Sequence, residues 1–103
     1  MNRDYTFYVY ILTNANKSVL YIGMTNSLKR RLVEHYNKRN PQSFTAKYNC
    51  HHLIYYEIYQ YVYDAMARET QLKKWSRKKK EALIKTKNPN FNSLNSNFVY
   101  VED

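Results

Sequence analysis

The sequence predicts a small α/β sandwich of the α+β type, with a three-stranded central β-sheet flanked by helices. Residues 6–13, 19–24 and 52–60 are rich in tyrosine and β-branched residues, which favours strands. Residues 26–38 and 65–87 carry apolar side chains at helical spacing. The resulting order is strand, strand, helix, strand, helix, and the short loop after the first strand makes the first two strands an antiparallel hairpin.

Length and charge limit the domain count and the class of partner. A chain of 103 residues forms one small domain, which we place at residues 5–94, with tails at 1–4 and 95–103. The net charge is +9, from 17 basic and 8 acidic residues, and such a surface attracts polyanions, most commonly nucleic acid. A basic protein without a nucleic-acid partner stays open at this point.

The expected location is the cytoplasm. The single cysteine, Cys50, permits no internal disulfide, which fits a reducing compartment. The N-terminus lacks the pattern of a signal peptide, and no apolar segment reaches the ~20 residues that span a membrane. We expect no membrane partner, and a monomer is favoured although the sequence does not fix the oligomeric state.

The first strand is expected at the centre of the sheet. Its alternate residues point to opposite faces, and both sets are largely apolar: Phe7, Val9 and Ile11 on one face, Tyr8, Tyr10 and Leu12 on the other. Gly23, the only glycine, ends the second strand. A lone glycine there indicates a close backbone approach or a dihedral angle that other residues avoid.

The first helix begins at Asn26 or Ser27, which can cap it, and runs to about Lys38. Its expected buried stripe is Leu28, Leu32 and Tyr36. Arg31 and His35 are four residues apart and lie beside this stripe, so they are predicted to point toward the sheet.

The polar side chains on the other side of the first helix are expected to be solvated: Lys29, Arg30 and Glu34. Residues 39–50 then read as a polar loop, whose Ser43, Thr45, Lys47 and Tyr48 could contact a ligand. In the third strand, Ile54, Tyr56 and Ile58 are predicted on one face, and Leu53, Tyr55, Glu57 and Tyr59 on the other.

The second helical stretch covers residues 65–87, with Asp64 as its expected cap and a possible break near Ser76. Its apolar face, with Ala65 and Leu72, also carries Glu69, a carboxylate that needs a partner there. The Asn88-Pro89 pair ends the helix. Residues 98–101 could form a short edge strand or remain disordered.

Several motifs together resemble the GIY-YIG nuclease superfamily, in its small stand-alone bacterial branch, the URI-domain group. They are, in order along the chain, Tyr8-Val9-Tyr10, Tyr21-Ile22-Gly23, Arg31, His35, Glu69 and the closing Pro89-Asn90-Phe91-Asn92. The resemblance covers about residues 5–94. The glycine and isoleucine of the first motif are Tyr8 and Val9 here, and no separate DNA-recognition domain is attached.

The resemblance implies a nuclease that hydrolyses DNA phosphodiester bonds with one divalent cation, Mg²⁺, with Mn²⁺ as the alternative. Glu69 would be the protein ligand of the cation, with waters and phosphate completing the shell. The other implied roles are a general base (Tyr21), a transition-state stabiliser (Arg31), a proton relay titrating near neutrality (His35), orientation of the water or phosphate (Tyr10), and support of the site (Gly23, Asn92).

Basic side chains on both helices could contact DNA phosphates without reading sequence: Lys29, Arg30, Lys73, Lys74, Arg77 and Lys78. Two other functional classes remain open. One is a nucleic-acid-binding module of the same fold with little or no catalysis, and the other is a basic protein-interaction domain. Cys50-His51-His52 lacks a second ligand pair at zinc spacing and is interpreted as structural.

Overall fold

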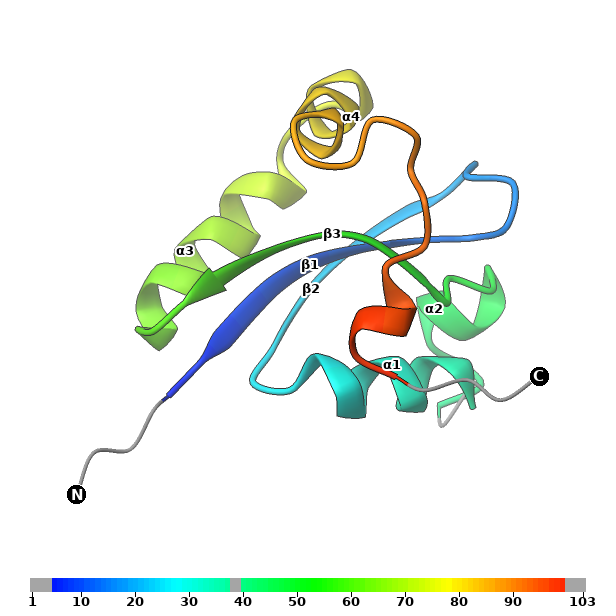
Figure 1. The fold of residues 1–103 in the computed structure, drawn as a ribbon, viewed down its shortest axis with the longest axis horizontal. Helices are drawn as coiled ribbons and strands as arrows, with labels where there is room; N and C mark the ends of the chain where they lie inside the picture. Colours follow the sequence, from blue (N-terminus) through cyan, green and yellow to red (C-terminus); the bar gives the residue numbers. More distant parts are fainter. Residues whose placement is uncertain (1–4, 38–39, 100–103) are drawn as a thin grey trace.

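The computed structural model describes residues 5–37 and 40–99. Its centre is a three-stranded antiparallel sheet in the order β2-β1-β3, formed by β1 (Phe7–Thr13), β2 (Leu20–Thr25) and β3 (His52–Tyr59) (Figure 1). The central position predicted for the first strand is therefore confirmed. So is the α+β class, with a small sheet between helices.

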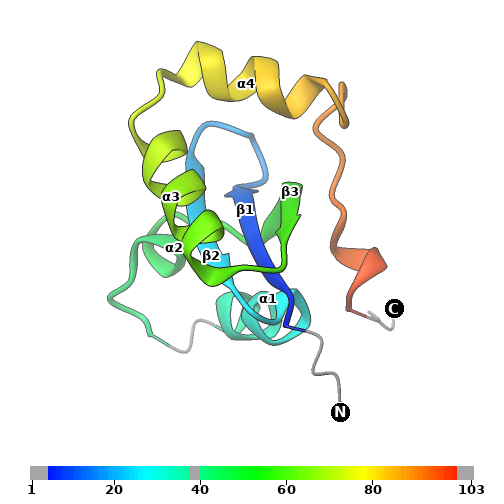
Figure 2. The ribbon, with the colours of Figure 1, turned by 90° about the vertical axis from the view of Figure 1, so that its left-hand side faces the viewer.

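Helices lie on both faces of this sheet. α3 (Val62–Lys73) and α4 (Arg77–Lys85) lie on one side and α1 (Leu28–Tyr36) on the other (Figures 1 and 2). The short α2 (Phe44–Lys47) lies beside β2, and a 3₁₀ turn (Asn95–Asn97) lies on the side of β3 (Figure 2). The sheet therefore has two unlike edges, one at β2 and one at β3.

Two hydrophobic clusters fill the space between the sheet and its helices. One contains Val9 and Ile11 with residues of α3 and α4, and the other contains Tyr10 and Leu12 with residues of α1. Successive residues of β1 thus enter opposite clusters, because side chains alternate along a strand. This burial on both faces explains why β1 is apolar throughout.

The first helix begins one residue after its cap. The Ser27 hydroxyl accepts a hydrogen bond from the Arg30 backbone N–H, as an N-cap does. Leu28 and Leu32 are buried as predicted, but Tyr36 is 71% exposed and His35 occupies the third buried position. The expectation for Tyr36 was wrong because the buried stripe follows a spacing of four and then three residues.

A β-bulge interrupts the alternation predicted for β3. Ile11 pairs with Tyr55 but Leu12 pairs with Leu53, which leaves Ile54 unpaired. Ile54 and Tyr55 therefore enter the same cluster, while Leu53 lies with Tyr56 in the other. The strict alternation expected from Leu53 to Tyr59 was wrong at its first two positions.

The second helical stretch consists of two helices, and the break between them lies near Ser76, as predicted. The Ser76 hydroxyl caps α4 by accepting from the Lys79 backbone N–H. α3 starts earlier than expected, with Tyr61 as its N-cap and no side-chain hydrogen bond there. Asp64 is therefore not the cap. It lies in the first turn, where its negative charge interacts favourably with the positive end of the helix dipole.

The C-terminal segment packs against the sheet through residue 99. Phe98 and Val99 contact the cluster under α1, and the Asn95 side chain bonds the backbone of His51 and Leu53. Residues 95–99 thus belong to the packed unit, beyond the boundary expected at 94, and residues 98–99 are not a strand. The expectations for residues 1–4 and 100–103 lie outside the described residues.

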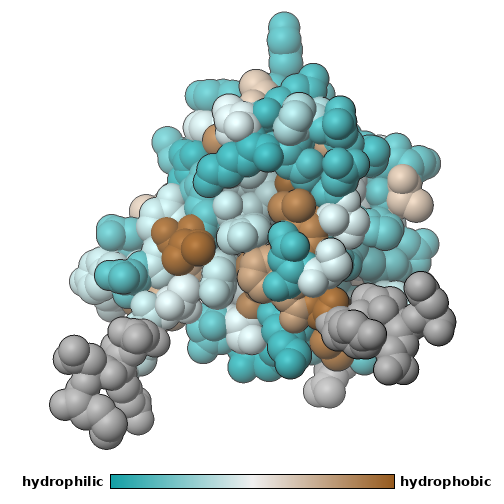
Figure 3. Space-filling view, viewed as in Figure 1, coloured by the Kyte–Doolittle hydropathy of each residue, from teal (hydrophilic) through white to brown (hydrophobic). Residues whose placement is uncertain are grey.

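The surface seen in Figure 3 is mostly hydrophilic, with small, separate hydrophobic patches. Within residues 5–37 and 40–99, no helix has the length and apolar character needed to cross a membrane.

Candidate active site

The pairing of β1 with β2 places Gly23 directly opposite Tyr10. A Cβ atom at position 23 would overlap the hydroxyl and ring of Tyr10, so only glycine leaves room for that ring. The backbone of Gly23 does not have a positive φ. Of the two reasons that the sequence offered for this glycine, the close approach is therefore the one that applies.

The Tyr10 hydroxyl is held by His35 of α1. His35 is 7% exposed, and its Nε2 lies 3.2 Å from the Tyr10 oxygen. Its other ring nitrogen, Nδ1, lies 2.8 Å from Oγ1 of Thr45 in α2. A line of hydrogen bonds thus joins β1, α1 and α2 beneath the surface. The prediction that His35 points toward the sheet is confirmed.

Burial changes the acid–base properties of this line. It raises the pKa of Tyr10 to about 12, while hydrogen bonding by Arg31 and the charge of Arg31 oppose the shift and the charges of Tyr21 and Glu69 add to it. Burial, followed by the nearby Arg31 charge, lowers the pKa of His35 to about 4. At neutral pH the phenol therefore keeps its proton and the imidazole is uncharged.

Because the phenol and the imidazole are both neutral, one ring nitrogen of His35 donates and the other accepts. In one tautomer the Tyr10 hydroxyl donates to Nε2 and Nδ1 donates to Thr45; in the other, Nε2 donates to Tyr10 and Nδ1 accepts from the Thr45 hydroxyl. One sequence-based expectation is corrected by this burial: His35 does not titrate near neutrality. Tyr10 is 1% exposed, and its role in orienting a water or phosphate stays a prediction.

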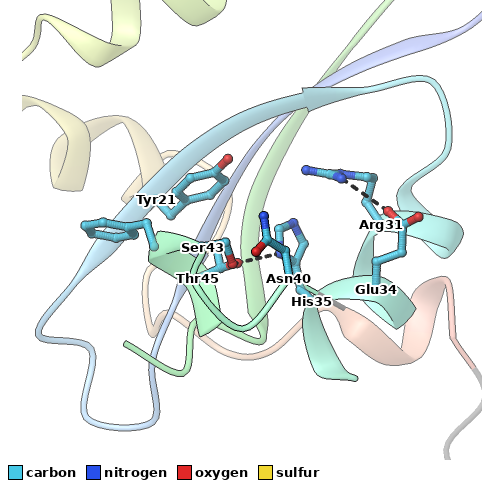
Figure 4. Close-up of a pocket in the computed structure, with 8 residues that line it drawn as sticks. Tyr21, Arg31, Glu34, His35, Asn40, Ser43 and Thr45 are labelled. Carbon is cyan, nitrogen blue, oxygen red and sulfur yellow. Dashed lines mark hydrogen bonds and ion pairs between the residues drawn. The ribbon is translucent and has the colours of Figure 1, made fainter. Parts of the chain in front are cut away.

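A cavity of about 440 Å³ lies above this line of hydrogen bonds. Figure 4 shows Tyr21 and Arg31 on opposite sides of it, with His35 and Thr45 between them. The cavity is lined by residues of β2, α1, α2 and the segment before α2: Tyr21, Arg31, Glu34, His35, Asn40, Ser43, Phe44 and Thr45. It therefore combines a cation, a phenol and several hydroxyl and amide groups.

Arg31 is held in the cavity by Glu34. Its Nη1 lies 3.2 Å from Oε1 of Glu34, and both side chains are only partly exposed. Its Nε is buried without a hydrogen-bond partner among the residues that the structure describes. The expectation that Glu34 is solvated was wrong, because one helical turn brings it under Arg31.

Three rings surround Tyr21. Its ring centre lies 5.9 Å from that of His35, 5.9 Å from that of Phe44 and 6.3 Å from that of Tyr10. The Phe44 ring is stacked on it, with 27° between the planes. Tyr21 is therefore fixed by packing at the point where its hydroxyl faces the cavity (Figure 4).

Glu69 lies on α3, which packs mainly against β2 and β1. Its carboxylate pairs with Lys73 at 3.4 Å, which is the partner that the sequence required. Glu69 does not line the 440 Å³ cavity, although its charge acts on Tyr10 beneath it. Among the described residues, no three His, Cys, Asp or Glu side chains form a cluster that could hold a metal ion.

Asn92 is not brought to the other candidate residues. Its backbone is held by the side chain of Asn88, which accepts from the Asn92 N–H and donates to its carbonyl oxygen at 2.8 Å. Asn88 also donates to the Ile54 carbonyl of β3, the edge opposite β2. Sequence reasoning took Asn88 only as a helix stop and missed that it anchors this loop.

The predicted phosphate-contacting residues are all exposed: Lys29, Arg30, Lys73, Lys74, Arg77 and Lys78. Arg77, however, donates to the backbone carbonyls of Lys17 and Ser18 and pairs with Glu81 at 2.9 Å. Its charge therefore ties α4 to the β1–β2 turn.

The sequence did not identify three residues that line the cavity: Glu34, Asn40 and Phe44. One available signal was Ser43, which caps α2 by accepting from the Ala46 backbone N–H. A serine directly before an apolar residue in a polar segment is a candidate helix start. Phe44 would then have been placed on a rigid turn rather than in a loop.

Comparison with known proteins gives a consistent result. A family model described as the GIY-YIG catalytic domain matches residues 6–82, a segment that includes Tyr10, Tyr21, Arg31, His35 and Glu69 but not Asn92. A UPF0213 protein of Bacillus pumilus (strain SAFR-032) is 38% identical over 77 residues, 75% of this chain and 76% of that protein.

Two further relatives support the match. A UPF0213 protein of Syntrophus aciditrophicus (strain SB) is 37% identical over 78 residues, 76% of this chain and 88% of that protein. The solution NMR structure of a UPF0213 protein from Bacillus halodurans is similar with a TM-score of 0.55 and 27% identity, over 94% of this chain and 99% of that one.

Proposed function

The chain belongs to the GIY-YIG family, and from this premise we propose that it is a divalent-metal-dependent nuclease that hydrolyses DNA phosphodiester bonds. The observation that carries the proposal is the cavity in which Arg31 and Tyr21 lie across from each other (Figure 4). A guanidinium and a hydroxyl facing one space are the groups needed to bind a phosphate and to direct a water at it.

Arg31 is proposed to bind the scissile phosphate. Its guanidinium is permanently charged, and Glu34 holds it from one side at 3.2 Å. Its Nη N–H groups that are not bonded to Glu34 can donate to phosphate oxygens, where negative charge grows in the transition state. Loss of one such donor typically costs 10²- to 10³-fold in rate.

Tyr21 is proposed to orient and deprotonate the attacking water. Its ring is fixed between His35 and Phe44, so its hydroxyl has one position in the cavity. The buried line from Tyr10 through His35 to Thr45 supports this position from below. In this proposal His35 works as a neutral hydrogen-bonding group that fixes geometry.

Glu69 is the residue that would hold the cation. In the described part of the chain Glu69 belongs to no group of three or more His, Cys, Asp or Glu side chains, which suits Mg²⁺, because that ion keeps several waters, and does not suit zinc. When bound, the cation would offset the negative charge on the phosphate and the leaving oxygen. Lys73, which pairs with Glu69 at 3.4 Å, would have to move aside or remain beside it.

The same ion pair favours a second candidate function. With its carboxylate engaged by Lys73, the protein could bind nucleic acid through its basic surface without catalysis. This binding module and the nuclease differ in one observable, which is cleavage that depends on added metal.

The test is nicking of supercoiled plasmid with Mg²⁺, with Mn²⁺ and with chelator. Glu69→Ala, Tyr21→Phe and Arg31→Met are compared with wild type, and each should lose at least 10²-fold in rate. The matched control is Glu81→Ala, which removes a carboxylate paired with Arg77 on α4. Glu81→Ala should cut at the wild-type rate.

DNA binding and folding are measured for every variant. Metal-dependent cutting by wild type and Glu81→Ala alone supports the nuclease. Wild-type binding with no cutting of plasmid, branched DNA or single strands, in either metal, would leave the binding module.

A further inference from the structure

A second cavity adjoins the first along the free edge of β2. It has a volume of about 260 Å³ and is lined by Leu20, Tyr21, Ile22, Phe44, Lys73 and Lys80. Tyr21 and Phe44 line both cavities, so the two cavities adjoin at these rings, and we call them together the β2 groove. Arg31 lies in one half of this groove, and the two lysines of α3 and α4 lie in the other.

Phe44 stands between the two halves with its ring open to solvent. The four phenylalanines of the chain all lie in the described part, and Phe44, at 45%, is the exposed one. Its ring centre lies 4.7 Å from that of Tyr48, which is 49% exposed, and its ring is also stacked on that of Tyr21. α2, capped by Ser43, holds Phe44 and Tyr48 on one rigid turn.

The β2 groove thus presents a cation, then exposed rings, then two further cations. This is the chemistry that binds single-stranded nucleic acid, in which bases stack on aromatic rings and basic groups follow the backbone. A base within a duplex is stacked on both faces, so it cannot lie on a protein ring unless it leaves the helix.

We propose that Phe44, backed by Tyr48, stacks an unpaired nucleobase next to the phosphate that Arg31 binds. Lys73 and Lys80 bind the neighbouring backbone phosphates. The substrate class is therefore nucleic acid with at least one unpaired nucleotide at the cleavage position, such as a single strand, a flap or a gap. This inference rests on the phosphate site proposed above, and it adds which class of nucleic acid that site prefers.

The test measures binding in chelator, so that it does not depend on cleavage. Fluorescence anisotropy compares a 20-nucleotide single strand, the same sequence as a blunt duplex, and an abasic strand of equal length and charge. Wild type should bind the single strand at least about tenfold more tightly than either of the others, because only the single strand offers unpaired bases that can stack on the ring.

Three variants locate the effect. Phe44→Leu should weaken binding of the single strand about tenfold and leave duplex and abasic binding unchanged. Phe44→Trp should retain or strengthen single-strand binding. The matched control is Tyr36→Leu, since Tyr36 is 71% exposed on α1 and lines neither half of the β2 groove.

The inference is overturned if wild type binds the abasic strand as tightly as the normal one. This comparison uses only the wild-type protein, so it does not depend on whether a variant folds. It is also overturned if Phe44→Leu weakens duplex and single strand equally, or if Tyr36→Leu has the same effect. The proposed nuclease fails separately, through absence of metal-dependent cutting. If the protein cuts duplex DNA as well as single strands, and does so with or without Phe44, the proposed nuclease activity stands. The proposed preference for unpaired nucleotides is then wrong.

Discussion

Single atoms decide the geometry around Tyr10. The absence of a Cβ at Gly23 leaves room for the Tyr10 ring, whose hydroxyl reaches His35. Gly23→Ala is therefore expected to push this ring away, with a cost of about 1–3 kcal/mol in the free energy of unfolding, as for other overpacked cores. Urea denaturation measures this cost.

A double-mutant cycle shows whether the cost arises at Tyr10. In a Tyr10→Leu background the ring is gone, so Gly23→Ala should cost less than 1 kcal/mol there. An equal cost in both backgrounds would mean that position 23 is intolerant for a reason other than this contact.

His35 should make stability depend on pH between about 6.5 and 4. Burial lowers its pKa to about 4 in the folded protein, below the value of about 6.5 for a free histidine. The unfolded state therefore binds the proton first, and the stabilisation present above pH 6.5 is lost as the pH falls to 4. The loss is about 3 kcal/mol, from 1.36 kcal/mol per pKa unit.

Urea denaturation between pH 7.5 and 4 measures this loss, and the NMR shifts of the His35 ring follow its protonation directly. His35→Gln should flatten the pH profile over that window. A ring that titrates near 6.5 in the folded wild type would contradict the buried, neutral role given to this residue.

At the scale of the elements, Glu57 joins β3 to α3. Its carboxylate accepts from both Nε and Nη2 of Arg68, at 2.8 and 2.9 Å, and from the hydroxyls of Tyr55 and Tyr59. Although burial alone would raise its pKa, these hydrogen bonds and the Arg68 charge lower it to about 2. The contribution of the Glu57 carboxylate to the free energy of unfolding is therefore present above about pH 4.5 and is lost as the pH falls toward 2.

Glu57→Gln should therefore destabilise the protein by about 3 kcal/mol at pH 7 and remove the acid-dependent step below pH 4.5. Arg68→Met should have a similar effect, and the double variant should cost less than the two single costs combined. Thermal and urea unfolding across pH 2–7 provide the measurement. Strictly additive costs would show that the pair does not act as a unit.

The elements also show how far sequence patterns reach. The spacing of Arg31 and His35 placed both on the sheet side of α1 correctly, because helical periodicity is local. The bulge at Ile54 could not be predicted, since an unpaired residue depends on how the partner strand aligns. α2 was missed because four residues give too short a pattern, although Ser43 did mark its start.

At the scale of the whole molecule, the candidate site depends on segments that are distant in sequence. The β2 groove combines a strand edge, the first residue of α2 and lysines of two later helices. Local patterns do not show which lysines meet which exposed ring, so sequence reasoning found Lys73 but gave Phe44 no role. It also grouped Asn92 with the site, whereas the chain places it beside the opposite edge of the sheet.

This asymmetry of the two sheet edges leads to a prediction about charge. The protein carries a net charge of +9, so single-strand binding should weaken steeply as the salt concentration rises. A plot of the logarithm of the association constant against the logarithm of the salt concentration should have a slope of about −0.7 per phosphate contacted. Lys80 lies in the β2 groove, while Lys87 lines a cavity beside β3 with Tyr55 and Leu94. Removing either lysine changes the net charge equally, but only one of them lies along the proposed path of the strand.

Lys80→Gln should therefore weaken single-strand binding and reduce the salt slope by about 0.7, and Lys87→Gln should leave both close to wild type. Phe44→Leu should lower affinity at every salt concentration without changing the slope, because stacking releases no counterions. Anisotropy titrations from 50 to 300 mM NaCl in chelator separate these effects. If both lysine variants reduce the slope equally, nucleic acid is attracted by the diffuse charge of the surface, and the strand does not follow the edge of β2.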